Sequence, residues 1–95
     1  MIFAGATNAG LMSWMEDEDY FKFSDEILMS TTEKIHLRDT AIYIYSSTDG
    51  QLDLIADTEI QIAATTVDIN GNVDVSGTYT GAGLMTTGGN IVIPN

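Results

Sequence analysis

Four oxygen-bearing side chains at alternate positions form the sharpest chemical pattern in the sequence. They are Asp68, Asn70, Asn72 and Asp74, with Gly71 at the centre of the segment. Calcium prefers several carboxylate and amide oxygens arranged around one tight turn. These four residues are therefore the candidate calcium ligands, and calcium is the only cofactor that the sequence indicates.

The same segment is also explained without a metal, by secondary structure alone, and we favour this explanation. The position that supplies the bidentate glutamate of an EF-hand loop, twelfth from Asp68, is occupied by Tyr79. Valine and isoleucine alternate on both sides of Asn70-Gly71, and Asn-Gly is a strong signal for a tight turn between two strands. The segment is thus interpreted as strand, turn and strand, with a calcium site as the alternative.

Residues suited to catalysis are few. His36 is the single histidine, so a Ser-His-Asp triad would depend on it, yet it lies between Ile35 and Leu37 on the predicted outward face of a strand. A glycosidase needs two carboxylates across a cleft, and a chain of 95 residues built from short strands has little room for one. We expect no enzymatic activity.

The composition limits the classes of partner. There are 14 acidic and 3 basic residues, for a net charge of -11, so the chain is poorly suited to nucleic acid or an anionic membrane. It has no cysteine, which excludes disulfides and thiolate metal sites. No apolar run is long enough to span a membrane, and the first residues lack the basic region of a signal peptide.

The elements that must position these residues are predicted to be short strands. From residue 20 onward the apolar residues follow period two rather than helical spacing, and each i, i+2 pair indicates a strand with one buried face. Successive pairs up to Val73 begin about seven residues apart. The pairs are Phe21/Phe23, Ile27/Met29, Ile35/Leu37, Ile42/Ile44, Leu52/Leu54, Ile60/Ile62, Val67/Ile69, Val73/Val75 and Ile91/Ile93.

Three zones follow from this pattern. Residues 1–19 are predicted to form an irregular N-terminal head or attachment segment, residues 20–76 a β-repeat stalk, and residues 77–95 a Gly/Thr-rich segment with a final short strand. The head ends in the acid run 16–19, which predicts either a solvated turn or a patch for a basic partner. Aromatic residues around it form the core of the head or an attachment surface: Trp14, Tyr20, Phe21 and Phe23.

A single chain of this size has difficulty burying its apolar residues. A small domain hides only about 60% of its surface and is marginally stable alone, whereas identical chains around one axis could share an apolar interior and pair their strand edges. The predicted fold is therefore all-β, an intertwined trimeric β-helix or β-prism stalk, with a small single-chain β-roll or sandwich as the alternative. The predicted trimer core consists of Ile42, Ile44, Leu52, Leu54, Ile60, Ile62, Val67, Ile69, Val73 and Val75.

The ladder of strands also resembles a known kind of sequence. One run extends from Ile35 to Leu54 and continues through residues 56–62 and 67–71. It resembles the β-repeat segment of tailed-bacteriophage virion structural proteins, and WMEDEDYFKFS, from Trp14 to Ser24, resembles the lead-in that often precedes that segment. The resemblance covers about residues 11–76. It implies a fibre, spike or other virion appendage, usually a trimer with an intertwined β-rich stalk.

Together these observations predict a non-enzymatic virion structural protein. The expected partners are two further copies of the chain, other virion proteins, and a host surface receptor or glycan, and the expected location is the virion, an extracellular particle. The alternative is a monomeric, calcium-stabilised binding module of the sugar-binding or cell-surface adhesin type.

Overall fold

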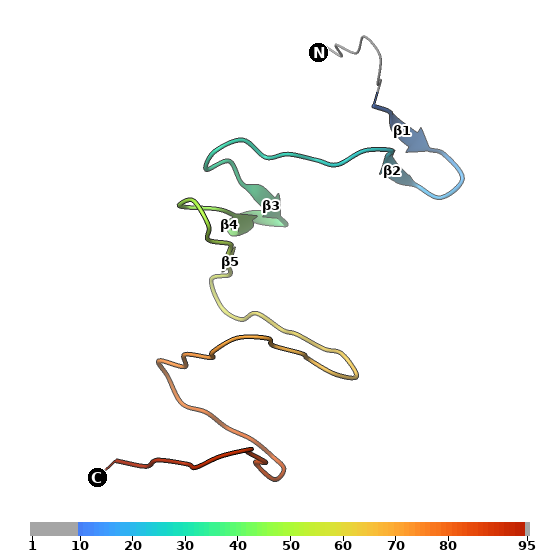
Figure 1. The fold of residues 1–95 in the computed structure, drawn as a ribbon. Helices are drawn as coiled ribbons and strands as arrows, with labels where there is room; N and C mark the ends of the chain where they lie inside the picture. The colour runs from blue at the N-terminus through green and yellow to red at the C-terminus, as the bar shows by residue number, and fades with distance from the viewer. Residues whose placement is uncertain (1–9, 95) are drawn as a thin grey trace. The chain divides into compact units, whose positions relative to one another are not determined.

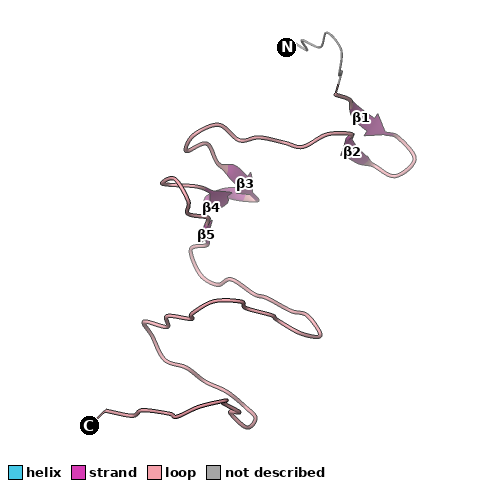
Figure 2. Cartoon of the chain, viewed as in Figure 1, coloured by secondary structure: helices cyan, strands magenta, loops and turns pink. Residues whose placement is uncertain are grey.

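The computed structural model describes residues 10–94, and its regular structure is all-β (Figures 1 and 2). Five strands form one two-stranded and one three-stranded antiparallel sheet, and residues 10–94 contain no helix. Accordingly, no helix in this part of the chain could cross a membrane. The predicted all-β class is confirmed. The chain divides into two units between Gln61 and Ile62, and both sheets belong to the first.

The first sheet is a hairpin of β1 (Met12–Met15) and β2 (Tyr20–Phe23). Its loop is residues 16–19, in which the Asp19 backbone N–H donates to the Met15 carbonyl at 2.8 Å and Asp19 has φ 59°. Aspartate is among the few residues that adopt this left-handed conformation readily. The acid run is therefore an ordered hairpin loop, and a regular hairpin crosses the expected boundary between residues 19 and 20.

The second sheet contains β3 (Ile35–Leu37), β4 (Asp39–Tyr45) and β5 (Asp53–Ile55) in that order. Ile35 pairs with Ile44, and Ile44 pairs with Leu54, so these three side chains form a row on one face. Tyr43 pairs with Ile55 on the opposite face. The period-two pattern thus places an aliphatic row on one face, and His36, Tyr43 and Tyr45 on the other.

Two tight connections order this sheet. Arg38, with φ 72°, joins β3 to β4, and the next residue, Asp39, accepts a hydrogen bond from the Ala41 N–H at its Oδ1. The β4–β5 loop contains a turn closed by the Gln51 N–H on the Thr48 carbonyl at 3.2 Å, with Gly50 at φ 85°. Asp49 and Gly50 are therefore the two central residues of this turn.

Beyond β5, the chain does not form the strands that its pattern predicts. No residue from Ala56 to Pro94 is assigned to a strand, and Figure 1 shows the orange-to-red part as extended legs joined by reversals. No backbone–backbone hydrogen bond joins two residues within 62–94. The prediction was wrong for a single chain, because an extended segment becomes a strand only when another strand pairs with it. The pairs concerned are Ile60/Ile62, Val67/Ile69, Val73/Val75 and Ile91/Ile93, and Ile27/Met29 is likewise outside any strand.

No side chain of residues 10–94 is fully buried. The most shielded run is Ile42–Ser46, in and just after the central strand β4, and it is only half-buried. This part of the chain therefore lacks the buried core that a single-chain β-roll or sandwich requires.

Candidate interaction surfaces

The aliphatic face of the β3–β4–β5 sheet forms a shallow groove of about 220 Å³. Four predicted core residues, Ile42, Ile44, Leu54 and Ile60, meet there, and Glu59 is the one charged residue that lines it. The full lining is Leu37, Ile42, Tyr43, Ile44, Leu54, Ile55, Ala56, Glu59 and Ile60, so Tyr43 and Ile55, which pair on the opposite face, also border the groove. Most of its lining is apolar, and no described residue of the first unit fills it.

The other six predicted core residues do not line the groove. Leu52 precedes β5 and is 72% exposed. The remaining five follow along the extended segment and are between 51% and 67% exposed: Ile62, Val67, Ile69, Val73 and Val75. Because they alternate with polar residues, they form an apolar side on each short extended stretch, and this side stays exposed.

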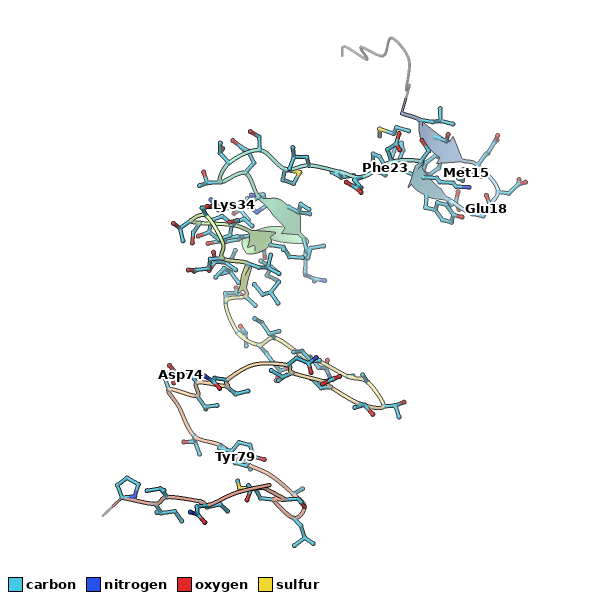
Figure 3. The ribbon with its side chains drawn as sticks, viewed as in Figure 1. Met15, Glu18, Phe23, Lys34, Asp74 and Tyr79 are labelled. Atoms are coloured by element: carbon cyan, nitrogen blue, oxygen red, sulfur yellow. The ribbon has the colours of Figure 1, made fainter. Side chains whose placement is uncertain are left out.

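The opposite face of the sheet carries a cluster of rings capped by a lysine. His36 and Tyr43, paired across β3 and β4, have ring centroids 5.6 Å apart, and Tyr43 and Tyr45 are 5.2 Å apart, both in edge-to-face geometry. Lys34, labelled in Figure 3, places its Nζ 5.2 Å from the Tyr43 centroid and 5.0 Å from that of Tyr45. These contacts give His36 and the two tyrosines a packing role.

Asp53 organises the loop between β4 and β5. Its Oδ2 accepts hydrogen bonds from the Ser47 N–H at 2.9 Å and the Ser47 hydroxyl at 2.7 Å, and its Oδ1 accepts one from Gln51 Nε2 at 2.7 Å. These donors, the Ser47 hydroxyl first, lower the pKa of the Asp53 carboxyl below its ordinary value, because they stabilise the ionised form. The carboxylate is therefore already used as the acceptor that holds the loop.

The candidate attachment residues lie on the β1–β2 hairpin. Trp14 pairs with Phe21, their ring centroids 5.0 Å apart, and Met12 pairs with Phe23. These four side chains share one face of the hairpin, because directly paired residues of an antiparallel ladder lie on the same side. Tyr20, the fourth predicted attachment residue, pairs with Met15 on the other face. Figure 3 labels Met15, Glu18 and Phe23 on this hairpin.

The candidate calcium ligands lie on the extended segment of the second unit. Asp68, Asn70, Asn72 and Asp74 are exposed, and the chain bends at Gly71 without a hydrogen-bonded turn. The Asn-Gly hairpin predicted here is thus not formed within one chain. Among residues 10–94, no three His, Asp or Glu side chains are grouped so as to hold a metal ion. Calcium binding by this segment remains a prediction.

Sequence reasoning missed three features of the first unit. Strand β1 lies within the predicted irregular head, although Met12 and Trp14 already show its alternation. The hydrogen bonds from Ser47 and Gln51 to Asp53 depend on loop geometry that no short motif indicates. The position of Lys34 over two rings follows from the β3–β4 register, which places residue 34 on the side of Tyr45.

Comparison of the chain with protein-family models, with curated proteins and with solved structures finds no match.

Proposed function

We propose that this chain is a non-enzymatic structural segment of a phage-like virion fibre, spike or other appendage, in which three copies form a stiff intertwined β-stalk. One observation carries the proposal: residues 62–94 run in extended legs whose backbone groups make no hydrogen bonds with one another, while their apolar residues recur at alternate positions and are exposed. The backbone groups gain partners and the apolar residues become buried if neighbouring copies pair their strands and pack their apolar sides against one another.

The groove on the three-stranded sheet supports the same arrangement. Ile42, Ile44 and Leu54 form an apolar surface that the described residues of the first unit leave partly open to solvent. Burial of apolar surface contributes about 25 cal/mol per Å² removed from water. Association of copies is therefore a large source of stability for a chain that has no internal core among its described residues.

The resemblance of residues 11–76 to virion β-repeat segments supplies the biological setting of the proposal. In that setting the partners are other virion proteins at one end and a host surface receptor or glycan at the other. The acidic exterior keeps such a stalk soluble and opposes side-to-side association.

The solution mass, measured by light scattering with and without a calcium chelator, tests this function. A species of three times 10.2 kDa that is unchanged by chelator supports the trimeric stalk. A 10.2 kDa species whose melting temperature falls on chelation would replace it with the calcium-stabilised binding module. A 10.2 kDa species indifferent to chelator would contradict both.

A further inference from the structure

The β1–β2 hairpin is a separate element of the first unit. Its strands contact each other and no other strand. Its open end is closed by two hydrogen bonds, from the Ser24 N–H to the Leu11 carbonyl at 2.9 Å and from the Leu11 N–H to the Ser24 hydroxyl at 2.8 Å. Its far end is closed by the bond between Asp19 and Met15. The hairpin is thus closed at both ends and has two distinct faces.

One face of the hairpin is apolar and open to solvent. Met12, Trp14, Phe21 and Phe23 are between 42% and 58% exposed, although their ladder positions place them side by side. An isolated two-stranded hairpin is marginally stable in water, and a hydrophobic face needs a cover. A contiguous aromatic surface of this kind marks an interaction site.

The charge around this face indicates which kind of partner could bind to it. Residues 10–26 contain six acidic side chains and one lysine, Lys22. Four of the acids form the loop 16–19, at the end of the aromatic face. If the faces of several copies covered one another, these like charges would be gathered together and would repel. A positively charged partner avoids this cost and gains from the same field.

We propose that the face formed by Met12, Trp14, Phe21 and Phe23 docks on a basic protein partner, which supplies an apolar pocket for the rings and lysine or arginine side chains for the acidic loop. The inference rests on the proposed function in one respect: in an appendage, this partner is an adjoining virion protein. Aromatic side chains supply most of the affinity at such an interface, and the charges supply specificity and a fast encounter.

Trp14 is the single tryptophan, so its fluorescence reports on this face in the full chain. The probe is a short peptide in which lysine alternates with valine, compared with matched peptides in which serine or glutamate replaces lysine. The lysine peptide is expected to shift the Trp14 emission to the blue, in a salt-sensitive manner. An equal shift with the serine or glutamate peptide would overturn the assignment of a basic partner.

Two matched variants separate the acidic loop from the overall charge. The triple variant Glu16→Gln, Asp17→Asn, Glu18→Gln keeps Asp19, which holds the left-handed loop conformation. The control, Glu33→Gln, Asp49→Asn, Asp57→Asn, removes the same charge elsewhere. The loop variant is expected to weaken peptide binding about tenfold, as three exposed charge pairs allow, and the control less than about twofold. Equal losses in both would show that net charge alone attracts the peptide and would overturn the proposal.

The Trp14 emission also distinguishes two other segments that could cover this face. A blue shift that develops as the chain is concentrated, without peptide, would assign the face to a second copy. Emission that moves to the red when residues 1–9 are removed would assign it to the chain's own N-terminal segment. Either result overturns the basic partner. The solution mass of the same samples tests the trimer independently, so failure of the docking surface and failure of the stalk are distinguishable.

Discussion

Asp53 and Ser47 are joined by two hydrogen bonds that span the loop between β4 and β5. The carboxylate Oδ2 accepts both the backbone N–H and the hydroxyl of Ser47, at 2.9 and 2.7 Å. The side chain of Asp53, the first residue of β5, thereby holds the start of the loop at Ser47.

This relationship predicts a pH dependence of the loop. The folded-state pKa of the Asp53 carboxyl is lowered, so the stabilisation is complete above the ordinary pKa of the unfolded chain and is lost as the pH falls through the lowered folded-state pKa. Replacing Ser47 by alanine removes the largest cause and is expected to raise the Asp53 pKa toward its ordinary value. An NMR titration of the Asp53 carboxyl carbon measures the change.

The neighbouring serine provides the control. The hydroxyl of Ser46 donates to the Thr48 carbonyl rather than to Asp53, so Ser46→Ala is expected to leave the midpoint of the Asp53 titration in place. If both alanine variants give the wild-type midpoint, the hydroxyl of Ser47 does not stabilise the carboxylate.

Charge placed in the shared apolar interior is expected to prevent assembly. In the proposed trimer, Ile60→Asp would bring one carboxylate from each copy into an apolar environment, at a cost of several kcal/mol per ion. Gln61→Asp adds the same charge at the next position, on the opposite side of an extended chain. Light scattering should find a monomer for the first variant and the wild-type mass for the second. A trimer of the Ile60→Asp variant would place this residue outside the interior.

Two glycines in open surroundings give a test of backbone conformation. A Cβ atom added at Gly50 or at Gly71 would meet no atom within 4 Å, but only Gly50 has a positive φ, of 85°. Gly50→Ala is therefore expected to destabilise the protein by about 1 kcal/mol. Gly71→Ala should be neutral or slightly stabilising, because alanine restricts the unfolded chain. Thermal unfolding compares them, and equal melting temperatures would mean that the turn at Gly50 tolerates alanine.

Removal of the lysine over the tyrosine rings is expected to weaken the three-stranded sheet. Lys34→Met keeps an apolar stem of similar length but removes the charge near Tyr43 and Tyr45, which should cost about 0.5–1 kcal/mol. Lys34→Arg retains a cation that stacks on aromatic rings and should stay close to the wild type. Chemical denaturation measures both variants, and an unchanged midpoint for Lys34→Met would assign the contact no stabilising role.

The residues of the first unit show how far the sequence predicts the fold. Alternation at Ile42 and Ile44 identifies β4 and assigns its two faces correctly, because the side chains of a strand have period two whatever its partner. For the aromatic residues of the hairpin, the sequence predicts either the core of the head or an attachment surface, and the ladder places Trp14 and Phe21 on one exposed face. The same pattern cannot tell which chain supplies the partner strand, so Val67/Ile69 and Val73/Val75 are apolar pairs without a ladder in the single chain.

The candidate sites were predictable to different degrees. Trp14 and Phe21 stand out by residue type, but their pairing depends on the loop 16–19 that sets the register. Asp53 is one of many acidic residues, and its role emerges only when the loop brings Ser47 within hydrogen-bonding distance. For Asp68 and Asp74, spacing alone does not distinguish a metal ligand from a solvated strand residue.

The unpaired extended legs of residues 62–94 have a consequence for how the protein is made. A newly synthesised chain has no internal ladder there to close, so under the proposed assembly its folding is a reaction of higher order, whose rate rises with the local concentration of copies. Until those copies meet, each leg is an open edge with an apolar side, and such an edge also recruits chains out of register. Productive yield is therefore expected to depend on synthesis of several copies close together in space and time.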